Sequence, residues 1–127
     1  MYNVITYKDR ADYDDVAEYI QKLNSKIATS KDARIRYKKI MEYIGKLQTY
    51  GVAVGMPTVE HITGTDLWEL RPNRDRFFFF YWKDDIFVLL HHFIKKTRKT
   101  PPREIEQAER KRQDFIERYG EQHEYDH

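Results

Sequence analysis

Residues 76–94, RFFFFYWKDDIFVLLHHFI, contain two apolar runs that are separated only by Asp84 and Asp85. Both runs are short and rich in aromatic or β-branched residues, which is typical of β-strands. The first run, Arg76–Lys83, is nearly all aromatic, as expected for a strand that is buried on both faces. The two aspartates supply turn chemistry. We therefore predict an antiparallel hairpin of Arg76–Lys83 and Ile86–Ile94.

Three segments on either side of this hairpin have apolar residues at helical spacing. The first helix is predicted over about residues 10–27. The second follows Ser30, which can cap it, and stops at Gly51. The third covers residues 100–120 and has proline at its start. Residues 52–65 contain glycine, proline and threonine, so we predict a loop there.

Two more segments are predicted to be strands. Residues 2–7, YNVITY, are β-prone, and residues 66–71 are joined to the hairpin by the turn-forming residues 72–75. The predicted fold class is α+β, in the order β-α-α-β-β-β-α. We expect the helices to pack against a four-stranded antiparallel sheet.

Length and composition limit the class of protein. The 127 residues fit a single domain over 1–127, with residues 120–127 as a flexible tail. The absence of cysteine excludes disulfides and Cys-based zinc sites. No apolar run approaches the length of a membrane span, and the N-terminus lacks the pattern of a signal peptide. We therefore expect a cytoplasmic protein with no membrane partner.

Basic residues are concentrated in one region, although the formal net charge is only +2. They are Arg71, Arg74 and Arg76 around one predicted turn, and Lys95, Lys96, Arg98 and Lys99 after the last predicted strand. Such a cluster indicates a local anionic partner. Charge runs are more often solvated surface, and arginines at a turn often pair with neighbours such as Glu69 or Asp75. The cluster alone therefore does not establish a function.

Strand alternation predicts which of these side chains share a face of the sheet. If residues 72–75 form a four-residue loop, Arg71 and Arg76 lie opposite each other. Counting back along both strands then places Glu69 opposite Phe78, on the same face as the two arginines. We therefore expect one carboxylate and two guanidinium groups to converge.

The length of the hairpin turn decides which residues of the last strand join them. If the two aspartates form the whole turn, His91 and Lys95 lie on the arginine face. A three-residue turn would place His92 and Lys96 there instead. We prefer the two-residue turn and leave the alternative open.

This set of side chains suits the chemistry of phosphodiester cleavage. Arginine and lysine can bind the scissile phosphate and stabilise the charge that develops on its oxygens. Glu69 or His91 can accept a proton from the attacking hydroxyl. In RNA that hydroxyl can be the substrate's own 2′-OH, so no metal or other cofactor is required. The aromatic residues Phe78, Phe80 and Tyr81 can stack on bases, although core packing is their commoner role.

Several stretches resemble a known family. They are LWELRP at 67–72, RFFFFYW at 76–82, LLHHFIKKTRKTPPREI at 89–105 and AERKRQDF at 108–115. These stretches are similar to the HigB branch of the RelE/ParE-type toxins, also described as phage-derived Gp49-like proteins. The similarity is strongest over residues 60–116, and K-K-T-x-K-T-P-x-x-E-I is its most specific run.

The resemblance implies a RelE-like fold and a toxin that cleaves mRNA on the translating ribosome without a metal. It also implies a HigA-like helix-turn-helix antitoxin, whose complex with the toxin binds operator DNA. A second branch of the superfamily inhibits DNA gyrase, so a non-nuclease inhibitor or a phage-derived nucleic-acid-binding module is the alternative. The predicted catalytic residues are Glu69, Arg71, Arg76, His91, Lys95, Lys96 and Lys99, and the predicted RNA-binding residues are Arg74, Arg98 and Tyr81.

Overall fold

The two apolar runs form a hairpin of strands β4, Asp75–Lys83, and β5, Ile86–Ile94, in the computed structural model, which describes residues 1–123. Both turn residues, Asp84 and Asp85, have positive φ angles, which a two-residue type I′ hairpin turn requires. Aspartate adopts this conformation more readily than most residues. The predicted hairpin is therefore confirmed, and β4 begins one residue earlier than expected.

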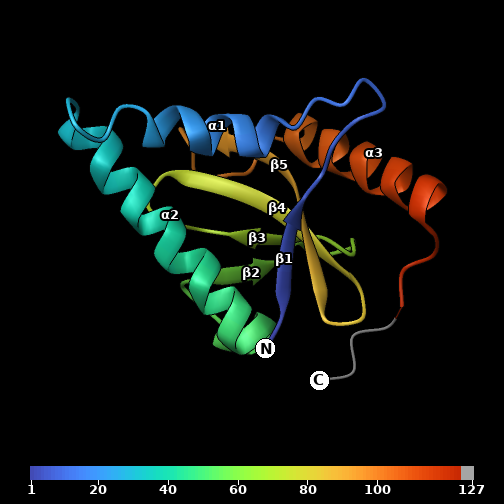
Figure 1. The fold of residues 1–127 in the computed structure, drawn as a ribbon. Coiled ribbons are helices and arrows are strands. Elements are labelled where there is room, and N and C mark those ends of the chain that lie inside the picture. Colours follow the sequence, from blue (N-terminus) through green and yellow to red (C-terminus); the bar gives the residue numbers. More distant parts are fainter. Residues whose placement is uncertain (124–127) are drawn as a thin grey trace.

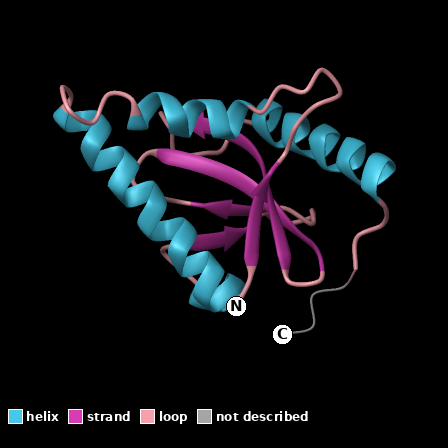
Figure 2. Cartoon of the chain, in the orientation of Figure 1, coloured by secondary structure: helices cyan, strands magenta, loops and turns pink. Residues whose placement is uncertain are grey.

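The hairpin lies inside a five-stranded sheet with the order β1-β5-β4-β3-β2 (Figures 1 and 2). The other strands are β1, Asn3–Thr6, β2, Val59–His61, and β3, Trp68–Leu70. β1 runs parallel to β5, and the remaining neighbours are antiparallel. The α+β class and the mostly antiparallel sheet are confirmed, but the sheet has five strands instead of the predicted four, and its β1–β5 pair is parallel.

The additional strand, β2, lies in the segment predicted as a loop. It is only three residues long, and Val59 is buried while its two followers are exposed. Its pairing with β3 aligns Glu60 with Glu69. β1 can run parallel to β5 because the two strands are joined through several intervening elements rather than by a tight turn.

The three helices are α1, Asp15–Asn24, α2, Lys31–Tyr50, and α3, Pro102–Tyr119. The bounds of α2 agree with the prediction. The Ala33 amide donates to the Ser30 hydroxyl at 3.1 Å, which caps the first turn of α2, and Gly51 ends the helix with a positive φ.

The first helix is shorter than predicted at both ends. Asp14 is its N-cap, because its side chain accepts from the Ala17 amide at 2.9 Å. The residues before it are held in a turn in which the Asp9 carboxylate accepts from the amides of Ala11 and Tyr13. Aspartate competes with helical hydrogen bonding in this way, which the apolar periodicity did not reveal.

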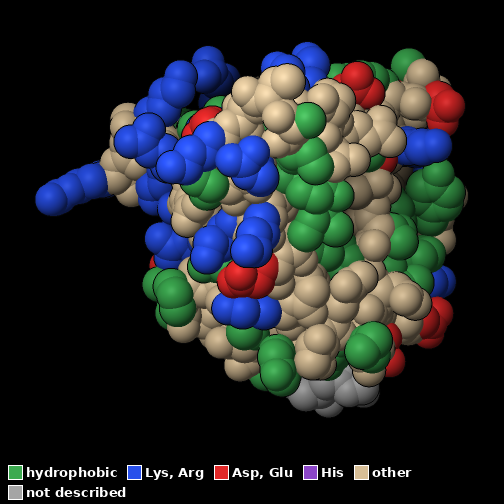
Figure 3. Space-filling view, turned by 60° about the vertical axis from the view of Figure 1, so that its left-hand side comes forward, with side chains coloured by type: hydrophobic (Ala, Val, Ile, Leu, Met, Phe, Trp, Pro, Cys, Tyr) green, Lys and Arg blue, Asp and Glu red, His purple; other side chains and the backbone are tan. Residues whose placement is uncertain are grey.

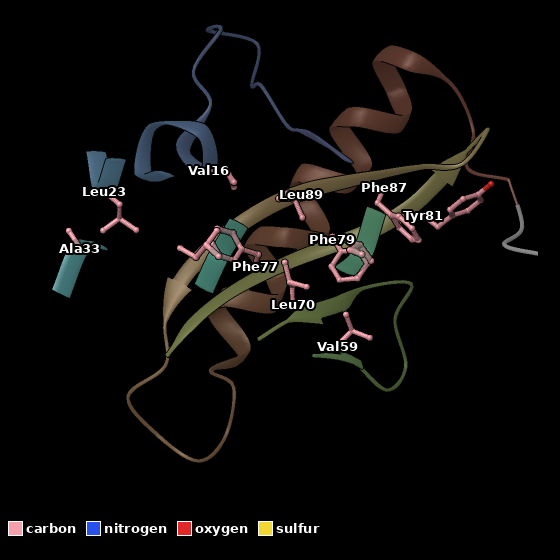
Figure 4. Packing of buried hydrophobic residues seen from close by; sticks show 12 residues of the cluster. Val16, Leu23, Ala33, Val59, Leu70, Phe77, Phe79, Tyr81, Phe87 and Leu89 are labelled. Carbon is pink, nitrogen blue, oxygen red and sulfur yellow. The ribbon is translucent and has the colours of Figure 1, made fainter. Parts of the chain in front are cut away.

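α1 and α2 cover one face of the sheet and α3 covers the other (Figure 1). Phe77 and Phe79 of β4 belong to the core on the side of α1 and α2, where Figure 4 shows them with Leu70 and Leu89. Phe78 and Phe80 belong to the core on the side of α3. The prediction that the aromatic strand is buried on both faces is confirmed.

Two register shifts of one residue in the β4–β5 pairing determine which residues of β5 point to each side of the sheet. The register shifts between Phe78 and Phe79 and again between Tyr81 and Lys83. The first shift is a β-bulge at Leu90, which packs on the α3 side, as does the next residue, His91. Phe78 therefore pairs with His91, as a two-residue turn predicts, and the alternative with His92 on this face is wrong.

Replacing Phe78 with alanine is expected to lower the free energy of unfolding by about 3–5 kcal/mol. The side chain is fully buried, and its ring centroid lies 5.3 Å from that of Phe93. Urea denaturation measures the change. Tyr13→Ala, at a site that is 54% exposed, is the matched control and should cost far less. A loss below about 1 kcal/mol for Phe78→Ala would contradict the packing described here.

α3 is connected to the chain between β1 and α1 by contacts around Asp114. This carboxylate accepts from the Tyr7 hydroxyl at 2.6 Å, from Arg10 Nε at 2.7 Å and from Arg118 Nη2 at 2.7 Å. Burial raises the pKa of Asp114, but the hydrogen bonds from Tyr7, Arg10 and Arg118 outweigh it and lower the pKa to about 2. The ionised form of Asp114 therefore stabilises the folded chain.

The contribution of Asp114 to stability should disappear in acid. Its folded pKa lies below the ordinary value of 3.8, so the contribution is complete above that value and is lost as the pH falls toward about 2. The expected loss is of the order of 1 kcal/mol, because solvent reaches part of the network. Asp114→Asn should flatten the pH dependence of the unfolding free energy in this range. Glu117→Gln, at an exposed carboxylate 3.6 Å from Arg10, should leave that dependence unchanged.

The first part of the predicted flexible tail is in contact with the sheet. The Trp82 indole donates to the Gly120 carbonyl at 3.0 Å, and the His123 amide donates to the Trp82 carbonyl at 2.6 Å. Residues 120–123 thus lie against β4, residues 124–127 lie outside the described part, and the flexibility of the tail stays a prediction. Within residues 1–123, none of the helices combines the length and apolar character that crossing a bilayer requires.

Candidate active site

The centre of the candidate site is the carboxylate of Glu69, on β3. Its side chain is only 2% exposed, and its Oε1 atom lies 3.5 Å from Arg71 Nε and 3.7 Å from Arg76 Nε. The Thr100 hydroxyl donates to the other oxygen, Oε2, at 3.4 Å. Buried carboxylates are rare unless they are paired with cations. Glu69, Arg71, Arg76 and Lys95 are called the carboxylate–arginine cluster below.

The β3–β4 hairpin places the two arginines around Glu69. The ladder pairs Glu69 with Phe78 and Leu70 with Phe77, so Arg71 and Arg76 follow at adjoining positions. Arg76 also closes the turn between the strands, because its Nη1 donates to the Asn73 carbonyl and to its neighbour's carbonyl. The predicted strand register is confirmed, whereas the catalytic roles of these residues stay predictions.

Lys95 approaches the cluster from the end of β5. Its amide donates to the Arg74 carbonyl at 2.9 Å, which continues the β4–β5 pairing past the last ladder residue. The positive charge of Lys95 lowers the pKa of Glu69, as do the charges of Arg76 and Arg71. Sequence alternation predicted this placement of Lys95 on the arginine face.

Burial dominates the electrostatics of the cluster. It raises the pKa of Glu69 above the ordinary value of 4.5, and the neighbouring cations only partly oppose this effect. It also lowers the pKa of Arg76, against the attraction of Glu69. A carboxylate whose pKa is raised toward neutral pH is a better general base than an ordinary one.

Two residues of the site were not identified from the sequence. Glu60, on β2, accepts from Arg71 Nη1 at 2.7 Å and fixes the exposed side of that guanidinium. It was missed because β2 was predicted as a loop, although Val59 carries the expected strand signal. Thr100 was missed as a partner of Glu69 because no local pattern reports this contact between distant segments.

His91 occupies the predicted face but contacts a different set of residues. Its Nε2 lies 2.7 Å from Glu104 Oε1, and its Nδ1 lies 2.8 Å from Lys111 Nζ, both on α3. The ring stacks on Phe78 with centroids 6.4 Å apart. Burial lowers the pKa of His91, although Glu104 opposes this effect. Both ring nitrogens of His91 already have partners on α3. A proton-transfer role for His91 stays a prediction, and Glu69 is the better candidate for that role.

The other predicted residues fall into two groups. The exposed ones are Arg74, Lys96, Arg98 and Lys99. Tyr81 is only 7% exposed, and its ring packs edge-on against Phe87 in the core. A buried ring does not offer its face to a base, so the burial of Tyr81 argues against its RNA-binding role, which stays a prediction. Phe78 and Phe80 are fully buried and are core residues for the same reason.

The surroundings of the cluster are positively charged. Figure 3 shows Lys and Arg side chains gathered over one side of the face that it presents. Lys95, Lys96, Arg98 and Lys99 form no ion pair with any residue within 1–123. Cations without protein partners are available to phosphate groups. No group of three potential metal ligands occurs among the residues that the structure describes.

Comparison with known proteins identifies one related family. Residues 16–113 match the family model described as phage-derived protein Gp49-like (DUF891). The matched range contains all of the carboxylate–arginine cluster, together with Glu60 and Thr100. No curated protein matches the chain.

Proposed function

Because the chain belongs to the phage-derived Gp49-like family, we propose that it is the toxin of a type II toxin–antitoxin pair and acts as an endoribonuclease on mRNA at the ribosome. The observation that carries this proposal is the buried Glu69 carboxylate between the guanidinium groups of Arg71 and Arg76. This arrangement combines a base of raised pKa with two cations that suit a phosphate.

In the proposed reaction, the ribose 2′-OH attacks the adjacent phosphorus and Glu69 accepts its proton. Arg71 and Arg76 stabilise the negative charge that develops on the phosphate oxygens. The bond from phosphorus to the 5′-oxygen breaks, which leaves a 2′,3′-cyclic phosphate and a 5′-hydroxyl. Lys95 is our candidate for the donor that protonates the leaving 5′-oxygen, because an ammonium group can donate a proton whereas the arginine guanidinium groups keep theirs. The nucleophile belongs to the substrate, so this sequence of steps needs no metal.

Access to Glu69 requires the Thr100 side chain to give up its contact, because the carboxylate is 2% exposed. Thr100, in the segment 95–101, lies against Glu69 through a long hydrogen bond of 3.4 Å, which is easily exchanged for another partner. Lys96, Arg98 and Lys99 of the same segment are exposed and can follow the RNA backbone. We infer that the RNA takes the place of the Thr100 hydroxyl on Glu69 and opens the cluster, while the backbone of the segment 95–101 stays in place.

The proposal includes partners that the similarity to HigB-type toxins implies. We expect a helix-turn-helix antitoxin to neutralise the protein, and the complex to bind operator DNA. The ribosome would present the mRNA to the basic segment. Co-expression with the product of an adjacent reading frame, followed by purification through a tag on one partner, tests the antitoxin part.

Controlled expression followed by mapping of transcript ends tests the nuclease function. We expect growth arrest together with new mRNA ends that carry a 5′-hydroxyl and follow the reading frame. An Arg76→Ala protein at equal abundance is the matched control. Growth arrest with intact transcripts and a DNA-damage response would support gyrase inhibition instead. Unimpaired growth with intact transcripts would support a non-toxic nucleic-acid-binding module.

A further inference from the structure

A cavity of about 520 Å³ lies beside the carboxylate–arginine cluster, between α1, the end of β5 and the start of α3. The consecutive residues Lys95 and Lys96 separate the two sites. Lys95 acts on Glu69, whereas Lys96 lines the cavity. Because successive residues at a strand end point to opposite sides, one short segment serves both sites.

The cavity exists because β1 covers only part of the edge of β5. The parallel pairing ends at Thr6 and Leu89, and the Tyr7 amide makes the last contact, at 2.9 Å, with the Leu89 carbonyl. Past this point, no strand within residues 1–123 pairs with that edge. His92 and Ile94 therefore line an open space beside this uncovered part of the edge.

One wall of the cavity is aromatic and is fixed in place. The Tyr19 ring stacks on His92 with centroids 3.7 Å apart. The Tyr19 hydroxyl donates to Asp75 Oδ1 at 2.6 Å, and His92 Nε2 lies 2.9 Å from the same oxygen. Phe93 and Pro101 continue this wall. The His92 side chain is only 10% exposed and lies under Tyr19, so the ring that a base can meet is that of Tyr19. A ring held in this way suits a nucleic-acid base, because little side-chain freedom is lost when a base packs on it.

Two of the residues that line the cavity are positively charged. They are Lys96 and Arg103, which are both exposed, and neither forms an ion pair in the part of the chain that the structure describes. Arg103 lies in the first turn of α3, where the helix dipole also favours an anion. Glu104 contributes a carboxylate, but its Oε1 is bonded to His91 Nε2 at 2.7 Å. Its second oxygen is an acceptor that a base amino group can use.

We propose that this cavity binds one RNA nucleotide next to the scissile phosphate, with the base against the Tyr19 ring that His92 supports and the phosphate on Lys96 and Arg103. This proposal rests on the proposed function, because it requires an RNA strand that crosses the end of β5 from the carboxylate–arginine cluster to the cavity. An acidic protein segment would use the two cations but would leave the flat wall unfilled. The combination of a wall and a pair of cations therefore favours a nucleotide.

A titration followed by NMR tests the site directly. The probe is a dinucleotide whose first ribose carries a 2′-O-methyl group, so that it cannot be cleaved. We expect saturable shifts at Tyr19, His92 and Thr97 in the low millimolar range or below. Inorganic phosphate should shift Arg103 without moving the two rings. Unchanged resonances at these positions at saturating probe would overturn the proposal.

Matched double variants separate this site from general electrostatic attraction. Lys96→Ala with Arg103→Ala should weaken dinucleotide binding about tenfold or more, because two phosphate-binding charges are lost. Lys8→Ala with Lys83→Ala removes the same charge far from the cavity and should change binding less than about twofold. Equal losses for the two pairs would overturn the proposal.

Competition with a hexaglutamate peptide tests the rival ligand class. If the peptide shifts the same resonances and displaces the dinucleotide with equal or higher affinity, the cavity is a protein-binding site and the proposal fails. The outcome is independent of cleavage. If the chain cuts mRNA but does not bind the dinucleotide, the proposed function stands and the proposed nucleotide site is wrong. If the chain binds the dinucleotide in the cavity but never cuts RNA, only the proposed nuclease function is wrong.

Discussion

The Arg76→Ala protein is expected to cut mRNA about 100- to 1,000-fold more slowly than the unmodified chain. Arg76 is one of the two guanidinium groups on Glu69, and it is held in place by hydrogen bonds to carbonyls of the β3–β4 turn. Its removal takes away a fixed positive charge where the phosphate charge develops. A reconstituted translation reaction with a defined mRNA measures the rate. Cleavage at the unmodified rate would show that the site is misplaced.

Two controls distinguish catalysis from folding at this position. Arg76→Lys keeps the charge but loses the planar fork, so it should recover part of the activity and remain about tenfold slower than the unmodified chain. Arg110→Ala changes an exposed arginine on α3 and should have almost no effect. The melting temperature of each variant shows whether the fold is retained, which matters because Arg76 is 8% exposed.

The Glu69→Gln protein is expected to lose about 100-fold or more of the cleavage rate at neutral pH, together with the acid limb of the pH profile. Burial raises the pKa of Glu69 above its ordinary value, so the active carboxylate form is lost as the pH falls through that raised pKa. The rate of the unmodified chain should therefore decline on acidification. Glutamine does not titrate, so the variant should show no such decline.

Measuring the free energy of unfolding of Glu69→Gln shows whether a loss of activity comes from catalysis or from folding. A raised folded pKa means that the protonated form is favoured below the ordinary pKa and that this advantage is lost as the pH rises through the folded pKa. Glutamine mimics the protonated carboxyl, so the variant should be no less stable at neutral pH. Glu60→Gln, at an exposed partner of Arg71, is the matched control and should retain most activity. A flat pH profile in the unmodified chain would contradict the assignment of the base.

The sequence was sufficient for features that depend on local patterns. The hairpin of β4 and β5 follows from two apolar runs around Asp84 and Asp85, and both aspartates adopt the positive φ angles that the turn requires. The cluster around Glu69 was predictable because most of its members lie on two strands joined by one short turn. Alternation along those strands then fixes their faces.

Features that depend on distant segments were not predictable in the same way. β2 is three residues long and is a strand only because β3 lies beside it, so its own sequence carries a weak signal. Glu60 and Thr100 reach the cluster through such long-range placement. The parallel pairing of β1 with β5 and the cavity beyond its end are likewise set by tertiary packing. The burial of Tyr81 could also be learned only from the structure, because a tyrosine near the end of a strand can lie in the core or on the surface.

The bulge at Leu90 has a consequence for how the chain tolerates insertions and deletions. Removing Leu90 would restore uninterrupted alternation in β5 and leave the faces of the later residues unchanged, because Leu90 and His91 already lie on the same side of the sheet. Removing Phe93 instead would exchange the faces of the residues after it, so that Lys96 would face Glu69 and Lys95 would face the cavity. The effect of losing one residue from β5 therefore depends on its position. At Leu90, the single unpaired position, the loss preserves the arrangement of side chains at the site, whereas a few residues later it exchanges them.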